Sequence, residues 1–106
     1  ASWCGPCRRE NPNVVANYNQ YKDKNFTVLG VSLDQSKPAW LNAIKNDNLT
    51  WTHVSDLRGW QNEVSSMFNI RSIPANILID PEGIILARDV RGSELGRVLS
   101  EILDKK

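Results

Sequence analysis

The sequence predicts one α/β domain with a mixed sheet and helices on both faces of that sheet. Helical and extended patterns alternate along the first part of the chain, which is typical of parallel crossovers between strands. Later, two apolar runs flank a tight turn and add an antiparallel pair. The 106 residues leave room for one domain, and 41% hydrophobic with 24% charged residues is an ordinary globular composition.

The first helix is expected to begin at Gly5 and to run to about residue 21 or 22. Large side chains recur at three- and four-residue spacing, which places them on one helix face. These residues are Val14, Val15, Tyr18 and Tyr21. Pro12 lies inside this stretch and lacks a backbone donor, so we expect it to kink the helix.

A strand, a second helix and another short strand follow. Residues 26–33 are apolar on both faces in their middle, which predicts a strand buried on both sides. Ser36 is expected to cap the next helix, with Pro38 in its first turn. The inward stripe of that helix would be Trp40, Leu41 and Ile44. Residues 51–54 form the short extended segment.

The last part of the chain predicts a helix, a hairpin and a closing helix. The third helix is indicated by offsets of four, seven and eight among Trp60, Val64, Met67 and Phe68. The runs 76–79 and 84–87 flank Asp80-Pro81-Glu82-Gly83, whose proline and glycine positions fit a type I turn. Ser93 is expected to cap the closing amphipathic helix, whose apolar face comprises Leu95, Val98, Leu99, Ile102 and Leu103.

Charge and composition exclude several classes of function. The 13 Lys and Arg residues against 12 Asp and Glu residues give a net charge of +1, so we expect no nucleic-acid partner. Two cysteines and one histidine are too few for a closed four-ligand zinc site within one chain. No apolar run approaches the roughly 20 residues needed to span a bilayer.

The segment Trp3-Cys4-Gly5-Pro6-Cys7 carries the chemistry. A disulfide between residues this close stabilises little, because its entropic effect grows with the loop that it closes. Cys4 stands at the start of a helix, where unpaired N–H groups and the helix dipole favour a thiolate and lower the pKa of Cys4. Cys7 is expected inside the first turn, where it would be the more buried of the two. A dithiol of this kind exchanges with disulfides through a mixed disulfide.

Residues 1–7 resemble the active-site segment of the thioredoxin-fold disulfide oxidoreductases, and further positions extend this resemblance. Pro12 matches the proline that kinks the active-site helix, and Arg71-Ser72-Ile73-Pro74 resembles the loop that carries the cis-proline. Residues 30–34 and 77–83 resemble the exported TlpA/ResA-like branch of the AhpC/TSA–thioredoxin superfamily. Residues 40–44 and 51–54 correspond to the insertion of that branch. The resemblance covers essentially the whole chain.

The resemblance implies a thiol-disulfide oxidoreductase that uses the Cys4–Cys7 pair and no other cofactor. Gly5-Pro6 is the dipeptide of reducing thioredoxins, which favours reduction of protein disulfides. Pro74 would be cis and face the cysteines, and the backbone of Ile73 would pair with an extended substrate. The substrate-binding residues implied are Trp3, Gly5, Pro6, Ile73 and Pro74.

Glu10 lies three residues after Cys7, and a glutamate at this spacing is linked to proton handling in the TlpA/ResA-like branch. A carboxylate beside the thiols could accept the proton of Cys7. The alternative is an exposed glutamate that merely suits the dipole of the first helical turns. The resemblance favours the first interpretation, so the catalytic residues that it implies are Cys4, Cys7 and Glu10.

The implied partners are disulfide-containing protein substrates and a thiol-disulfide electron donor, which in this branch is often a membrane protein. The implied location is an exported compartment, such as the periplasm, in cell redox homeostasis or a cytochrome c maturation type of role. One alternative is a peroxiredoxin-like peroxidase, although the Thr that precedes the peroxidatic cysteine at a fixed spacing is absent. Another is a copper chaperone of the same fold, although His53 is not in a matching context and is expected to be structural or exposed.

In the fold that the chain resembles, the cysteine motif follows a central strand. Here the motif begins at Trp3, which leaves no room for such a strand. Residues 1–106 are therefore expected to be a single thioredoxin-like domain that lacks its N-terminal strand or strands. A sheet without its central strand would expose the apolar flanks of the neighbouring strands.

Overall fold

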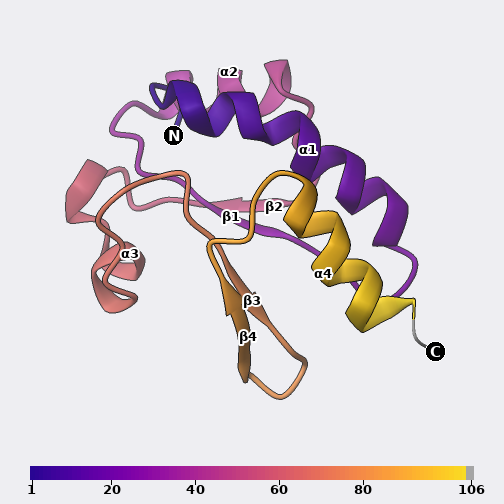
Figure 1. The fold of residues 1–106 in the computed structure, drawn as a ribbon. Helices are drawn as coiled ribbons and strands as arrows, with labels where there is room; N and C mark the ends of the chain where they lie inside the picture. Colours follow the sequence, from indigo (N-terminus) through magenta and orange to yellow (C-terminus); the bar gives the residue numbers. More distant parts are fainter. Residues whose placement is uncertain (105–106) are drawn as a thin grey trace.

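The computed structural model describes residues 1–104, which form four α-helices, one 3-10 helix and two small sheets. In chain order these are α1 (Gly5–Tyr21), β1 (Leu29–Val31), α2 (Lys37–Asn46), β2 (Thr52–Val54), η1 (Gly59–Gln61), α3 (Glu63–Met67), β3 (Ile77–Ile79), β4 (Ile85–Arg88) and α4 (Ser93–Leu103). Helices and strands alternate and a hairpin follows, so the predicted α/β class is confirmed (Figure 1). Among the described residues, no helix is long and apolar enough to cross a membrane.

The strands form two separate pairs rather than the single mixed sheet that the sequence predicts. β1 pairs in parallel with β2, with Gly30 opposite His53, and β3 pairs antiparallel with β4, with Leu78 opposite Ala87. Within residues 1–104, β1 and β3 are not hydrogen-bonded to each other. A cavity of about 240 Å³ is lined by β1, by the segment that precedes β3 and by α1. The parallel and antiparallel halves of the sheet are therefore present but unjoined.

β1 is shorter and more exposed than the sequence predicts. Of residues 26–33, only Leu29–Val31 pair as a strand, and the Leu29 side chain is 60% exposed instead of buried. Val31 in the same strand and Ile79 in β3 are exposed as well. The physical reason is that no strand among the described residues covers the free edges of β1 and β3.

The helices lie where the sequence predicts, with two differences in their ends and one in their exposure. Leu41, predicted on the inward stripe of α2, is 48% exposed, so that part of the prediction is wrong. The third predicted helix is divided into η1 and α3, because Asn62 adopts an extended conformation and its side chain caps α3 by accepting from the Ser65 N–H at 2.9 Å. The prediction that Ser93 caps the closing helix is wrong, since Ser93 is already in α4 and the cap is Gly92. Gly92 has a φ of 59°, a left-handed value that glycine adopts without strain.

The predicted N-cap at Ser36 and the predicted hairpin turn are both confirmed. The Ser36 hydroxyl accepts from the Ala39 N–H, and α2 begins at the next residue with Pro38 in its first turn. In the hairpin, the Asp80 carboxylate accepts from the N–H groups of Glu82 and Ile84, and Gly83 has a φ of 87°. α1 runs unbroken through Pro12.

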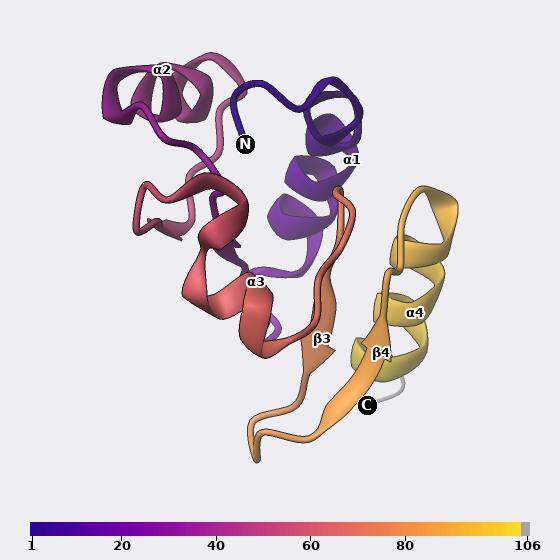
Figure 2. The ribbon, with the colours of Figure 1, turned by 90° about the vertical axis from the view of Figure 1, so that its left-hand side faces the viewer.

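The hydrophobic core lies where α4 packs against α1 and the hairpin. Figures 1 and 2 show α1 and α4 side by side, with the β3–β4 hairpin between α4 and α3. The buried members of the core are Tyr21, Val90, Leu95 and Leu99. This core fixes α1, and α1 carries the cysteine pair at its N-terminal end.

Candidate active site at the start of helix α1

Cys4 and Cys7 are joined by a disulfide across the first turn of α1, with 5.2 Å between their Cα atoms. Cys4 is the N-cap in an extended conformation, and its Sγ accepts from the Cys7 N–H at 3.2 Å. Pro6 lies in the first turn, where its missing N–H leaves no helical bond unmade. The helix therefore begins directly after Cys4, and its first turn directs the Cys7 N–H at the Cys4 sulfur.

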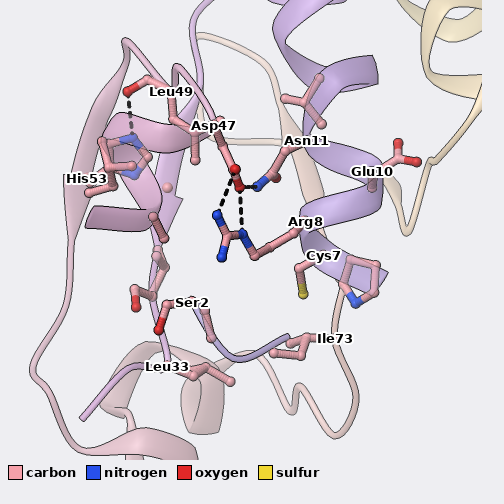
Figure 3. Close-up of a pocket in the computed structure, with 18 of the residues that line it drawn as sticks. Ser2, Cys7, Arg8, Glu10, Asn11, Leu33, Asp47, Leu49, His53 and Ile73 are labelled. Carbon is pink, nitrogen blue, oxygen red and sulfur yellow. Dashed lines mark hydrogen bonds and ion pairs between the residues drawn. The ribbon is translucent and has the colours of Figure 1, made fainter. Parts of the chain in front are cut away.

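The relative burial of the two cysteines differs from the prediction. Cys4 is buried, at 5% exposure, whereas Cys7 is only partly buried. The expectation that Cys7 is the more buried residue is therefore wrong for this structure. The reason is that Cys7 lines the cavity between α1 and β1, and Figure 3 shows its sulfur pointing into that cavity.

The loop before β3 brings Ile73 and Pro74 to the disulfide. The Ile73–Pro74 peptide bond is cis, as the resemblance implies. The Ile73 carbonyl oxygen lies 4.0 Å from the Cys4 Sγ, so residues 69 positions apart meet at the site. Ile73 and Pro74 also line the cavity that contains Cys7.

The remaining residues of the motif present an exposed surface beside the disulfide. Gly5 and Pro6 are exposed, and Trp3 is 53% exposed. The Trp3 ring lies 6.3 Å from the Trp60 ring, measured between centroids, and Trp60 is 47% exposed. The sequence indicates only a packing role for Trp60, because its proximity to Trp3 arises from the tertiary fold.

Glu10 lines the same cavity as Cys7, but its carboxylate is bonded elsewhere. Its Oε2 accepts from the Gly92 N–H at 3.0 Å and from the Asn13 side-chain amide at 2.8 Å. Figure 3 shows the carboxylate pointing away from Cys7. Glu10 therefore links the active-site helix to the N-terminus of α4, a contact that no sequence spacing indicates.

Asp34 is a buried carboxylate that anchors the residues in front of Cys4. It follows β1, and its oxygens accept from the backbone N–H and the hydroxyl of Ser2 and from the hydroxyl of Ser32. Burial acts to raise the pKa of Asp34, but these hydrogen bonds outweigh burial and hold its pKa below the ordinary value. The ionised Asp34 therefore fixes Ser2, two residues before Cys4, to the end of β1.

A second carboxylate ties α1 to α2. The Arg8 guanidinium donates two hydrogen bonds to Asp47, at 2.9 and 3.0 Å, and the Asn11 amide donates a third at 3.0 Å (Figure 3). The hydrogen bonds from Arg8 lower the pKa of Asp47 and more than offset its partial burial. The positive charge of Arg8 is therefore directed at Asp47.

His53 has the structural role that the sequence predicts. Its Nε2 is 3.2 Å from the Leu49 carbonyl oxygen, and its ring stacks on Trp51. Burial lowers the pKa of His53, which favours the neutral ring. Within residues 1–104, no group of three or more His, Cys, Asp or Glu residues has the arrangement of a metal site.

Comparison with known proteins agrees with this geometry. The model of the AhpC/TSA family matches residues 1–88, which include both cysteines and the cis-proline loop. The chain belongs to the AhpC/TSA family. A thiol-disulfide oxidoreductase from Bacteroides fragilis is 43% identical to it and superposes with a TM-score of 0.90, over 97% of this chain and 76% of that one.

Two further relatives define the branch of the family. The thioredoxin domain of a thiol-disulfide oxidoreductase from Bacteroides vulgatus is 35% identical, with a TM-score of 0.88 over 96% of this chain and 73% of that one. The thiol-disulfide oxidoreductase ResA from Bacillus thuringiensis is 27% identical over 98% of this chain and 58% of its own length. The chain thus has the thioredoxin fold and resembles ResA. The match covers nearly the whole of this chain but less than two thirds of the length of these ResA relatives.

Proposed function

We propose that the protein is a thiol-disulfide oxidoreductase that reduces protein disulfides with the Cys4–Cys7 dithiol. The observation that carries the proposal is the disulfide across the first turn of α1, with the Cys4 Sγ held by the Cys7 N–H and facing the Ile73 carbonyl. The relatives named above support it, because their names describe the same activity.

The proposed reaction transfers two electrons from the reduced Cys4–Cys7 dithiol to a substrate disulfide. The Cys4 thiolate attacks a substrate disulfide, the substrate S–S bond breaks, and the released substrate thiolate takes up a proton. The Cys7 thiolate then attacks the Cys4 sulfur of the mixed disulfide and releases the second substrate thiol. The substrate gains two electrons, and the Cys4–Cys7 bond found in the structure is the oxidised product.

Substrate binding is assigned to the residues that surround the disulfide. Trp3, Gly5 and Pro6 supply an exposed surface beside Cys4. The backbone of Ile73, held before the cis-Pro74, would pair with an extended substrate segment. This proposal is supported by the 4.0 Å approach of the Ile73 carbonyl to Cys4.

The reduction of insulin tests the proposed function. With dithiothreitol as the electron source, the protein is expected to reduce insulin, so that the insulin B chain precipitates. In a second experiment, equilibration of the protein with glutathione gives the reduction potential of the Cys4–Cys7 pair. A potential close to that of thioredoxin, about −270 mV, supports the reducing direction. A potential near that of strong oxidants, about −120 mV, would contradict it.

Glu10 is proposed to influence the proton of Cys7 through the cavity that both residues line. In Glu10→Gln the side-chain carbonyl can still accept from the Gly92 N–H, so the contact with α4 is kept while the negative charge is removed. Loss of a nearby negative charge favours the thiolate, so the pKa of Cys7 is expected to fall. The measurement is the pH dependence of thiol alkylation by iodoacetamide.

The matched control for Glu10 is Glu63→Gln, which removes an exposed carboxylate in the first turn of α3. It should leave the thiol titration unchanged. If Glu10→Gln also leaves the titration unchanged, Glu10 has only the structural role of joining α1 to α4.

The proposed partners are disulfide-containing proteins as substrates and a thiol-disulfide protein as the electron donor, in an exported compartment such as the periplasm. We also propose that, in the complete domain, a further strand fills the cavity between β1 and the segment that precedes β3. The exposed apolar side chains of Leu29, Val31 and Ile79 along these free strands support that proposal. The peroxidase and copper-chaperone alternatives are not favoured, because the relatives are thiol-disulfide oxidoreductases and the two cysteines pair with each other.

A further inference from the structure

Three arginines line a surface pocket beside the cis-proline loop. Arg71, Arg88 and Arg91 surround this pocket of about 240 Å³, together with Pro74. They come from the loop before β3, from β4 and from the segment before α4, so only the fold brings them together. We call this set the arginine pocket.

Each guanidinium makes one hydrogen bond within the protein. Arg88 Nη2 donates to the Phe68 carbonyl at 2.9 Å, and Arg91 Nη1 donates to the Pro74 carbonyl at 3.1 Å. Arg71 Nε donates to the Asn69 side chain at 3.2 Å. A guanidinium has five N–H donors, so each arginine keeps donors free for a ligand. Anchored guanidinium groups lose less conformational freedom when they bind, which favours recognition.

The charge of the arginine pocket is not neutralised within the described part of the chain. Each of the four ion pairs found in residues 1–104 involves other basic residues, and Asp89 is the one acidic residue that lines the pocket. Three positive charges against one negative charge leave a local excess of two in a chain whose net charge is only +1. Planar carboxylates are the protein groups that fit guanidinium best, through paired hydrogen bonds.

The arginine pocket adjoins the candidate active site through Pro74. Pro74 lines both this pocket and the cavity that contains Cys7, and the preceding carbonyl of Ile73 lies 4.0 Å from the Cys4 Sγ. An extended peptide advances roughly 3.3 Å per residue. A segment whose cysteine is bonded to Cys4 can therefore place a side chain two to four residues away over the arginine pocket.

We propose that the arginine pocket binds an acidic side chain of the disulfide-containing protein substrate, two to four residues from the cysteine that Cys4 attacks. The inference rests on the proposed function, because it names a feature of the substrate of the same site. It predicts that reduction by this protein is faster for disulfides flanked by Asp or Glu. It also predicts that salt weakens this preference, since the contact is exposed.

The test uses three synthetic peptides that contain the same intrachain cystine. They carry Glu, Gln or Lys three residues from one cysteine, and dithiothreitol provides a reference rate that corrects for their intrinsic reactivity. Relative to that reference, the reduced protein is expected to reduce the Glu peptide about fivefold faster than the Gln peptide at low ionic strength. The Lys peptide should be the slowest, and high salt should bring the three rates together.

Variants of the arginines show whether the preference arises from this pocket. Arg71→Gln should lower the preference for the Glu peptide about twofold, and Arg71→Gln/Arg88→Gln should lower it further, while the rate for the Gln peptide stays constant in both variants. Arg71 is the safer single change for folding, because its guanidinium donates to the side chain of Asn69 in the same loop, whereas Arg88 and Arg91 donate to backbone carbonyls. The matched control is Arg58→Gln, an exposed arginine outside the pocket, which should keep the preference.

The outcomes separate this inference from the proposed function. Equal reduction of all three peptides, or a preference that survives in both arginine variants, would overturn the role of the arginine pocket and leave the reductase proposal intact. If the protein reduces none of the three peptides, the reductase proposal itself is contradicted.

Discussion

Replacement of Cys4 by serine is expected to lower insulin reduction to the rate of dithiothreitol alone. The Cys4 sulfur is the atom proposed to attack the substrate, and a serine hydroxyl remains protonated and unreactive towards disulfides at neutral pH. The effect should be the largest of any single substitution in the chain. The measurement is the rate of turbidity in the insulin assay, compared with the wild-type protein.

The choice of serine separates chemistry from folding. Cys4 is the N-cap of α1 and its Sγ accepts from the Cys7 N–H, and a serine hydroxyl is one of the preferred acceptors at this position. The free energy of unfolding of Cys4→Ser should therefore match that of the reduced wild-type protein to within about 1 kcal/mol. Wild-type turnover in Cys4→Ser would show that Cys4 is not the nucleophile.

Leu99→Ala is expected to have the largest effect on stability. Leu99 is 1% exposed and packs with Tyr21, Val90 and Leu95, where α4 meets α1 and the hairpin. Truncation of a fully buried leucine leaves a cavity and costs about 3 kcal/mol. Because small domains are stable by only about 5–15 kcal/mol, this is a large fraction of the total. Urea denaturation followed by tryptophan fluorescence measures the difference.

Ile102→Ala is the matched control on the same helix. Ile102 is 37% exposed, so its truncation should cost about 1 kcal/mol or less. Equal costs for Leu99→Ala and Ile102→Ala would show that the core is not centred on the contact of α4 with α1. The folded fraction of Leu99→Ala should still reduce insulin, since Leu99 is not among the residues around the disulfide.

Local sequence signals account for the parts of the site that depend on neighbouring residues. The Cys4–Cys7 pair and the turn at Asp80–Gly83 each depend on only a few neighbouring residues, and the structure confirms both. The cis state of Ile73–Pro74 is different, because base rates favour trans and only the family resemblance indicates cis.

Features that depend on long-range contacts could not be predicted. The approach of Trp60 to Trp3, the bond from the Gly92 N–H to Glu10 and the assembly of the arginine pocket each join residues far apart in sequence. The burial of Cys7 was mispredicted for a related reason. A helical position indicates which face a side chain lies on, but the cavity beside β1 determines how exposed that face is.

The most direct test of the central claim is to trap the mixed disulfide with Cys7→Ser. This variant keeps the attacking Cys4 but lacks the thiol that resolves the intermediate, so it should accumulate a covalent complex with a disulfide-containing substrate such as insulin. Mass spectrometry after digestion is expected to locate the bond at Cys4, and Cys4→Ser should give no comparable complex. A substrate bond at Cys7 in Cys4→Ser, together with none at Cys4 in Cys7→Ser, would contradict the proposed mechanism.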